Sequence, residues 1–374
     1  MGGFLFSTEG WPYLLVPFIP AAIALELGHA NATLIFFIAA AAIIPTAALM
    51  GRATEELAAK SGPGIGGLLN VTFGNAPELI IALFALNAGL HEVVKASIIG
   101  SIMGNVLLVM GAAFVAGGVG RGGAIQRFDR TAANVQATML LLAAAALLLP
   151  ALFELIDGGS LPAVGIERVN YPSNVETISV IVGAVLVLTY IAGLFFSLRT
   201  HKDVFNPVAD AGQDGHDEDL WGWTVRKSVT ALFLAGIAVG LMSEILVSSI
   251  GEASESVGLS EFFIGVIVVA IVGNAAEHWV AVLVAFKGKM DLAVNIAIGS
   301  SAQIALFVAP VLVFCSFFIG PEPMALVFNG YELGAILLTI LIASQVTQEG
   351  ESTWFEGVQL LAMYVILAVV FAFA

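Results

Sequence analysis

Long apolar runs recur along the whole chain and constrain its fold more than any other feature. Only 11% of the 374 residues are charged and 59% are hydrophobic, whereas a water-soluble domain carries about 25% charged residues. Eleven segments approach or exceed the about 18–20 apolar residues that a helix needs to cross a membrane. The sequence therefore predicts an all-α polytopic membrane protein with about eleven transmembrane helices, at residues 11–27, 32–57, 62–89, 92–118, 132–153, 175–198, 223–250, 259–287, 290–319, 330–347 and 353–374.

The basic residues predict how these segments are oriented. When successive connections are assigned to alternate sides, starting with the N-terminus, one side receives 11 of the 13 Lys and Arg residues and the other only Lys95 and Arg168. Basic loops remain in the cytoplasm, so the N-terminus and the connection 199–222 are predicted to be cytoplasmic. The compact chain favours a prokaryotic plasma membrane. Segment 11–27 is short and contains three prolines, so it either crosses the membrane or lies along its surface.

The connection 199–222 is the one conspicuously polar part of the chain, and its acidic residues lie within 203–219. Two interpretations remain open for this acidic segment. It is either a solvated loop or a region that attracts and senses divalent cations.

Charge and cysteine content argue against several functions. A net charge of -15 with few, scattered basic residues argues against nucleic-acid binding. The single cysteine, Cys315, provides neither a disulfide framework nor a thiolate metal site. The chain contains no His-Glu-x-x-His run and no paired aspartates within an apolar run, so we expect neither an intramembrane protease nor another enzyme, and no cofactor. The oligomeric state is left open.

Two short motifs reveal an internal repeat. Gly-Asn-Ala-Pro-Glu at 74–78 is followed 199 residues later by Gly-Asn-Ala-Ala-Glu at 273–277. Five predicted helices make one repeat, and because five is odd the second copy crosses in the opposite direction. Inverted repeats are typical of secondary transporters, which bind their substrate at the membrane midplane between the copies. We therefore predict four regions: an extra N-terminal helix (1–30), a first five-helix repeat (31–198), the acidic loop (199–222) and a second, inverted repeat (223–374).

Glu78 and Glu277 end these motifs near the middle of their apolar segments. An ionised carboxylate at the bilayer centre costs about 2.5–3.5 kcal/mol on insertion scales. Because the sequence offers no Lys or Arg near either motif, two facing carboxylates need another positive partner. A hard divalent cation, which prefers oxygen ligands, and a pair of protons both satisfy this need.

Neighbouring residues add oxygen ligands. Each motif places an asparagine three residues before its glutamate, on the same helix face. Pro77 cannot donate a backbone hydrogen bond and clashes with the carbonyl four residues earlier, so it should free carbonyls in its turn. The second motif has Ala276 at that position, so Gly273 alone must loosen that turn. The predicted ligands are Glu78, Glu277, Asn75, Asn274, Ser101, Asn105, Ser300 and Gln303, with backbone carbonyls around Phe73, Gly74 and Gly273.

The same pair of carboxylates suits exchange. With Ca2+ bound, two ionised glutamates make the site neutral; once Ca2+ leaves, desolvation and mutual repulsion favour protonation of both. Charge balance predicts about two protons per Ca2+. We assign proton coupling to Glu78 and Glu277, with His278 and Glu244 as candidate proton relays.

Structural interpretations compete with some of these roles. Asn75, Asn274 and the small polar residues that follow each motif are also suited to hydrogen bonds between membrane helices. His278 could be a packed neutral histidine, and Glu244 could pair with a helix end. Glu55 and Glu56 lie beside Arg52 at the end of their segment and are predicted to form a surface ion pair.

The two motif regions resemble the calcium/proton exchanger (CAX) family within the wider cation/calcium exchanger group. The resemblance rests on 62–80 with 95–105, and on 272–278 with 298–303. It implies one extra N-terminal helix before an inverted five-plus-five core, proton-driven removal of cytoplasmic Ca2+, and Glu78 and Glu277 as the essential pair. Sodium/calcium exchangers typically carry an additional carboxylate at the position of Gln303.

Two other transport functions remain as alternatives. A Na+/Ca2+ exchanger would respond to a Na+ gradient and not to pH. A cation channel could use the same carboxylates, although an inverted repeat with a buried site favours alternating access.

Overall fold

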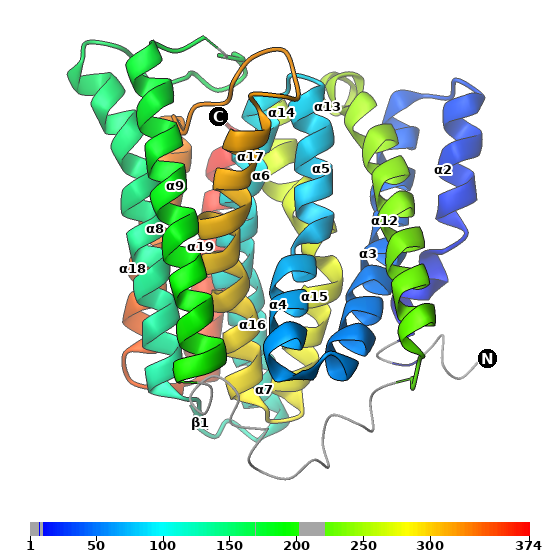
Figure 1. The fold of residues 1–374 in the computed structure, drawn as a ribbon, viewed down its shortest axis with the longest axis vertical. Coiled ribbons are helices and arrows are strands. Elements are labelled where there is room, and N and C mark those ends of the chain that lie inside the picture. Colours follow the sequence, from blue (N-terminus) through cyan, green and yellow to red (C-terminus); the bar gives the residue numbers. More distant parts are fainter. Residues whose placement is uncertain (1–6, 8–9, 169, 202–220) are drawn as a thin grey trace.

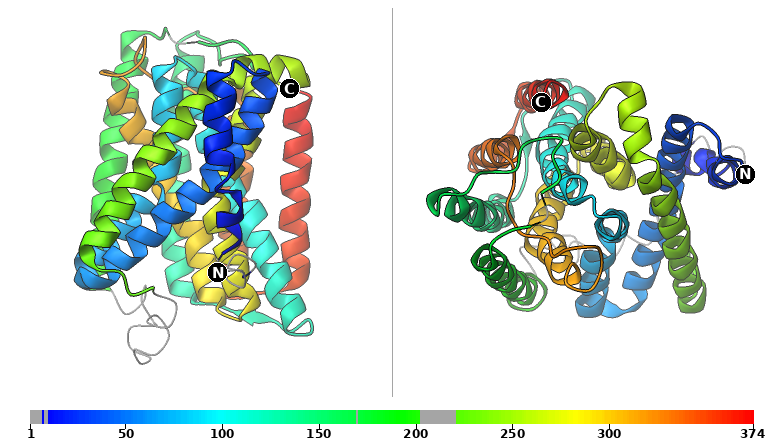
Figure 2. Two further views of the ribbon diagram at one scale, coloured as in Figure 1. Left: turned by 90° about the vertical axis from the view of Figure 1, so that its right-hand side faces the viewer. Right: turned by 90° about the horizontal axis from the view of Figure 1, so that it is seen from above.

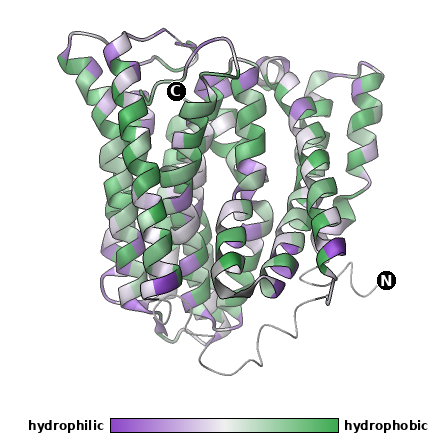
Figure 3. Ribbon diagram, in the orientation of Figure 1, coloured by the Kyte–Doolittle hydropathy of each residue, from purple (hydrophilic) through white to green (hydrophobic). Residues whose placement is uncertain are grey.

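The chain forms a bundle of long helices (Figure 1). The structure is a computed structural model that describes residues 7, 10–168, 170–201 and 221–374, so the acidic segment 203–219 lies outside the described residues. In the described part, nine helices are long and apolar enough to cross a membrane, and a bent pair makes a possible tenth. Apolar residues cover most of the length of these helices, and hydrophilic residues gather mainly near their ends (Figure 3). The predicted all-α membrane fold is confirmed, but the described helices do not reach eleven full spans.

The N-terminal part is shorter than a membrane span. It consists of η1 (Trp11–Leu15) and α2 (Phe18–Leu27), which together form one short apolar segment. Prolines interrupt its helical hydrogen bonding. The first repeat follows as α3 (Ala32–Lys60), α4 (Gly62–Gly74), α5 (Ala76–Asn87), α6 (His91–Met103), η2 (Gly104–Val109), α7 (Met110–Gly120), α8 (Arg130–Ile156), α9 (Ser173–Phe195) and η3 (Phe196–Thr200).

The second repeat has the same order of helices in the opposite direction. Its elements are α12 (Val225–Ser248), α13 (Ile250–Val257), α14 (Glu261–Phe263), η4 (Ile264–Val269), α15 (Ala270–Phe286), α16 (Met290–Gln303), η5 (Ile304–Val308), α17 (Ala309–Cys315), α18 (Gly330–Thr347) and α19 (Trp354–Ala372). In Figure 1 the chain rises from α4 to α5, whereas it descends from α14 to α15. The first helices of the two repeats, α3 and α12, pack side by side and are tilted across the bundle (Figure 2).

The motif helices of the two repeats differ locally. In the first repeat the helix breaks at Asn75, and the parts on either side, Leu68–Gly74 and α5, are bent by 41°. Pro77 explains this break, because it removes the N–H that would bond to the Phe73 carbonyl. In the second repeat α15 runs without a break through Gly273. The prediction that Gly273 loosens its own turn is therefore wrong, because without a proline the backbone hydrogen bonds stay intact.

Irregular turns occur at other places in the motif helices. The segments η2, η4 and η5 are π-helical, a local widening that is frequent at functional sites. Two of them occupy similar places in the two repeats: η2 contains Asn105, and η5 begins directly after Gln303. These wider turns change the direction in which the neighbouring polar side chains point.

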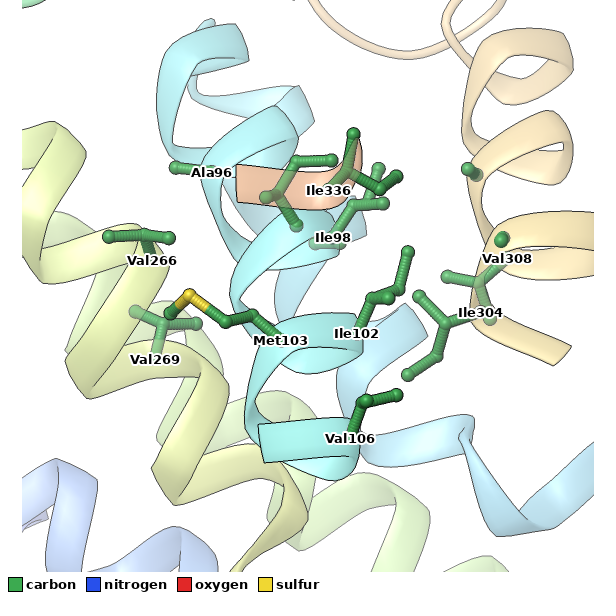
Figure 4. Close-up of a cluster of buried hydrophobic side chains, with 14 of the residues drawn as sticks. Ala96, Ile98, Ile102, Met103, Val106, Val266, Val269, Ile304, Val308 and Ile336 are labelled. Carbon is green, nitrogen blue, oxygen red and sulfur yellow. The ribbon is translucent and has the colours of Figure 1, made fainter. Parts of the chain in front are cut away.

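The two central helices, α6–η2–α7 and α16–η5–α17, are the most enclosed in the described bundle. Gly100 of α6 allows the closest approach, because a side chain there would collide with the Val266 carbonyl of η4. Around this contact lies the apolar cluster of Figure 4, which includes Ile98, Ile102 and Ile304. The two central helices therefore form a densely packed, poorly solvated core beside the motifs.

A small sheet, which the sequence did not predict, ties two connections together. Strand β1 (Gln126–Arg127) pairs antiparallel with β2 (Glu351–Ser352). Arg127 also forms an exposed ion pair with Glu351 at 3.0 Å. The sheet joins the α7–α8 connection to the α18–α19 connection, on the side of the bundle that carries most basic residues.

The surface ion pair predicted for Glu55 and Glu56 at the end of α3 is confirmed only in part. Arg52 contacts the exposed Glu55 carboxylate at 3.3 Å, which confirms an ion pair at the surface. The Glu56 carboxylate also lies within 3.7 Å of Arg52, but its side chain is fully buried and not at the surface. It accepts hydrogen bonds from the backbone N–H groups of Trp221 and Trp223. Glu56 therefore fastens the start of the second repeat to the end of α3.

Candidate cation-binding site

Each motif glutamate lies against the glycine of the other motif. A Cβ atom at Gly273 would lie 3.3 Å from Glu78 Cγ and 3.4 Å from Glu78 Oε1, and a Cβ atom at Gly74 would lie 3.4 Å from Glu277 Oε1. Two carboxylates from helices 199 residues apart thus meet between α5 and α15, close enough to interact electrostatically. The glycines leave the room that two acidic side chains need at the crossing of the repeats.

The two carboxylates have different partners. Ser300 Oγ of α16 donates a hydrogen bond to Glu277 Oε2 at 3.0 Å. Glu78 Oε2, by contrast, is buried and finds no hydrogen-bond partner in the described part of the chain. A buried carboxylate oxygen without a donor is unfavourable, and a cation or a proton relieves that cost.

The two asparagines use their amide nitrogens to join the repeats. Asn75 Nδ2 donates to Gln303 Oε1 at 2.6 Å. Asn274 Nδ2 donates to Ser101 Oγ at 3.1 Å and to the Ala270 carbonyl at 2.9 Å. Both asparagines therefore form the hydrogen bonds between membrane helices that the sequence analysis gave as their structural interpretation.

The amide oxygens of the same asparagines take no part in these hydrogen bonds. Asn75 Oδ1 and Asn274 Oδ1 are buried, and neither has a hydrogen-bond partner among the described residues. Together with Glu78 Oε2, these two amide oxygens make three oxygens of the site that have no hydrogen-bond donor among the described residues. Carboxylate and amide oxygens are the ligands that Ca2+ prefers, so the residues present fit a hard divalent cation.

His278 and Asn105 form a further contact between the repeats. His278 Nε2 lies 3.0 Å from Asn105 Oδ1, and the ring packs over Gly104. The contact holds the titratable ring of His278, the residue that follows Glu277, against η2. The structure thus brings His278 and Asn105 to one another, as part of the same polar cluster.

Three residues predicted to act as a proton relay or as carbonyl ligands do not provide the group that was expected. Glu244 is exposed on α12 and takes part in none of the contacts that join the other candidates. The Phe73 carbonyl, which Pro77 frees from its helical partner, accepts a hydrogen bond from the Asn75 N–H. The Gly273 carbonyl lies inside the continuous helix α15, where a carbonyl bonds to the N–H four residues later.

Two polar residues near the site escaped the sequence analysis. A cavity of about 10 Å³ is lined by Glu78, Ser97, Ser101 and apolar side chains, which is about the space that one water molecule needs. The signal for Ser97 was its spacing of four residues from Ser101, which places both on one face of α6. Gln136 of α8 is the second, and its signal was an amide inside a strongly apolar run.

Sequence and structure comparisons agree on the kind of protein. A sequence model of the family described as sodium/calcium exchanger protein matches residues 31–199 and 227–373. A Ca(2+)/H(+) antiporter of Aphanothece halophytica is 43% identical to this chain over 373 residues, which is 96% of this chain and 95% of that protein. The Ca(2+)/H(+) antiporter ChaA of Bacillus subtilis (strain 168) is 44% identical over 354 residues, which is 94% of this chain and 96% of that protein.

A solved structure is similar over nearly the whole fold. The crystal structure of the selenium-substituted Ca2+/H+ antiporter protein YfkE superposes with a TM-score of 0.80 at 40% identity. The superposition covers 97% of this chain and 99% of that chain.

Proposed function

The chain belongs to the sodium/calcium exchanger protein family, on its calcium/proton exchanger branch, and from this premise we propose that it exchanges Ca2+ for protons by alternating access. Glu78 and Glu277 are the carboxylates that hold Ca2+ in one half of the cycle and protons in the other. Relatives at 43% and 44% identity over almost their full length carry the name Ca(2+)/H(+) antiporter, which supports this exchange.

Ca2+ binds between the two repeats with its charge matched by two ionised glutamates. Glu78 and Glu277 face each other from α5 and α15, and the oxygens of Asn75 and Asn274 complete the set of neutral ligands. Ser300 holds the Glu277 carboxylate in place through its hydrogen bond. Since Ca2+ takes six to eight oxygen ligands, bidentate carboxylates, amide oxygens and water together fill its coordination sphere.

Release of Ca2+ makes protonation necessary. Two bare carboxylates in a poorly solvated site repel each other and lack hydration. Two protons restore neutrality, so a site with either cargo can pass the apolar barrier while an empty, ionised site cannot. This restriction couples the two fluxes at about two protons per Ca2+, by charge balance alone. His278, which Asn105 holds in place, is suited to pass protons to and from the neighbouring Glu277.

The direction of transport follows from the orientation in the membrane. The described helices include nine candidate spans, so the protein is an integral membrane protein. The distribution of basic residues supports a cytoplasmic location of the N-terminus and of residues 199–222, in a bacterial plasma membrane. In this orientation the proton gradient drives Ca2+ out of the cell, and the acidic segment 203–219 raises the local concentration of Ca2+ at the cytoplasmic face.

One observation supports this function most directly: two half-buried carboxylates meet across the repeats, each against the other motif's glycine, and Glu78 Oε2, Asn75 Oδ1 and Asn274 Oδ1 have no hydrogen-bond partner in the described part of the chain. The test is Ca2+ uptake into proteoliposomes driven by an imposed pH gradient, for the wild type, Glu78→Gln and Glu277→Gln. We expect proton-driven uptake in the wild type and its loss in both variants. Gln retains the size of the side chain but removes the exchangeable charge.

A Na+ gradient serves as the control in the same vesicles. Uptake that follows Na+ and ignores pH would move the chain to Na+/Ca2+ exchange. Uptake that continues along the Ca2+ gradient without any counter-ion would instead indicate a channel.

A further inference from the structure

Gln136 of α8 lies next to the site but has no part in the function proposed above. Its side chain packs against Gly299 of α16: a Cβ atom at Gly299 would lie 3.4 Å from Gln136 Nε2 and 3.8 Å from Gln136 Oε1. Oε1 is buried and has no hydrogen-bond partner within the described ranges of the chain. A buried amide oxygen without a donor is costly, so its position calls for a functional explanation.

The face of α16 that Gln136 contacts leads directly to the site. Asn295, Gly299 and Gln303 are spaced four residues apart, so they follow one face of the helix. At one end of this row Gln303 accepts the hydrogen bond from Asn75. Beside Gly299, Ser300 donates to Glu277. Gln136 and Asn295 therefore continue the polar surface of the site along α16.

This polar row extends toward the basic side of the bundle. Helix α8 begins at Arg130, so Gln136 lies about 9 Å along the helix from that end, at 1.5 Å per residue. Helix α16 begins just after Lys289, and Asn295 lies between this start and Gly299. The row thus runs from the site toward the face that we assign to the cytoplasm.

The first repeat has a polar row of its own, formed by Ser97, Ser101 and Asn105, but it lacks a counterpart of the contact between Gln136 and Gly299. A shift of 199 residues places Ala96 and Gly100 at the positions of Asn295 and Gly299. Gly100 is closed off by the Val266 carbonyl, whereas Gly299 leaves room for the Gln136 amide. A side-chain amide therefore packs against Gly299 and not against Gly100, although the two repeats share their architecture.

We propose that Gln136 is a pathway residue for the cation, and that its amide oxygen binds Ca2+ briefly between the cytoplasm and Glu277. The proposal rests on the function proposed above. An ion that leaves bulk water needs replacement oxygens. A neutral amide supplies one without the tight binding that a third carboxylate would impose, and a passage site must bind weakly enough to release the ion.

The test compares Gln136→Leu with Gln345→Leu, a matched control at an exposed position of α18, the counterpart of α8 in the second repeat. Both variants are measured in vesicles of both orientations. For Gln136→Leu we expect the KM for Ca2+ presented at the cytoplasmic face to rise about fivefold, as for the loss of one weak ligand, with a similar Vmax. For Ca2+ presented at the other face, KM should stay unchanged and Vmax should fall about fivefold, because exit uses the same route. Gln136→Asn should restore part of the effect.

Each outcome separates this proposal from the function on which it rests. If the wild type shows no proton-driven Ca2+ flux, the proposed function fails. If the wild type exchanges normally and Gln136→Leu behaves like Gln345→Leu, only the role of Gln136 is refuted. Equal changes of KM at both faces together with a lower Tm would also refute it, since they indicate a structural role for Gln136.

Discussion

Asn75 Nδ2 donates a hydrogen bond to Gln303 Oε1 at 2.6 Å, across the boundary between the two repeats. The bond joins the break between α4 and α5 to the place where α16 passes into the π-helical turn η5. Because the amide nitrogen of Asn75 is used in this way, its oxygen points elsewhere and has no hydrogen-bond partner in the described part of the chain. One hydrogen bond thus joins the two repeats and fixes the orientation of the Asn75 amide.

In the proposed exchange the neutral side chain of Gln303 keeps the number of carboxylates at the site to two, and Gln303→Glu tests this role. The carboxylate can still accept the Asn75 hydrogen bond, but three acidic groups around one Ca2+ leave a net negative charge in a poorly solvated site. We expect the coupling ratio to rise toward about three monovalent ions per Ca2+, by charge balance. Coupled Ca2+ and charge flux under voltage clamp measures it. Gln303→Leu, which adds no charge, should keep the wild-type ratio; an unchanged ratio in Gln303→Glu would contradict the charge-balance mechanism.

Gly273→Ala should weaken Ca2+ binding without weakening the fold. The added Cβ would lie 3.3 Å from Glu78 Cγ, so the carboxylate must shift by a few tenths of an ångström. We expect KM for Ca2+ to rise by about three- to tenfold, which corresponds to about 0.7–1.4 kcal/mol. The Tm should not fall, because alanine favours a helix over glycine by up to about 1 kcal/mol. A lower Tm with an unchanged KM would show that Gly273 serves packing and not the site.

Ser300→Ala should change the pH dependence of exchange. Ser300 Oγ stabilises the ionised form of Glu277 through a hydrogen bond, and a bond to a charged group contributes about 1.5–3 kcal/mol. Without it, protons compete better with Ca2+, so the pH of half-maximal Ca2+ binding should move upward by about one unit. Calcium binding measured across a pH series tests the shift.

Ser301→Ala is the matched control for that experiment. Ser301 Oγ donates to the Ala297 carbonyl at 2.9 Å and not to a carboxylate. Its removal should leave the pH profile in place. A similar shift in both variants would mean that the effect comes from the helix and not from the hydrogen bond to Glu277.

Lys95→Met should destabilise the protein at the end of α6. The buried Lys95 Nζ donates to the Val327 carbonyl at 3.2 Å and interacts electrostatically with the buried Glu332. Lys95→Met leaves the buried Val327 carbonyl without its donor, which costs about 1–3 kcal/mol, and removes a positive charge that stabilises the ionised form of the buried Glu332. A thermal melt in detergent should show a much lower Tm for Lys95→Met, and Glu332→Gln added to it should recover part of the loss. A double variant no more stable than the single one would argue against the pairing.

Some features followed from the sequence alone because they depend on local composition. Apolar runs need no partner to be recognised as membrane helices, and an odd number of them between two copies of a motif is enough to invert the second copy. Glu78 and Glu277 stand out because an acidic group inside such a run requires compensation. Pro77 breaks its helix through its own covalent geometry. The membrane fold, the inverted repeat and the central pair of acids were therefore predictable.

Other features depend on which helix faces meet, and only the tertiary structure decided them. Each glutamate lies against the opposite glycine because the two motif helices cross closely, in contacts between residues 195 and 203 positions apart. The burial of Glu56 depends on where Trp221 and Trp223 return to α3, and the approach of Gln136 to Gly299 depends on how α8 packs on α16. Such contacts arise from close packing of whole side-chain surfaces, which local sequence patterns do not encode.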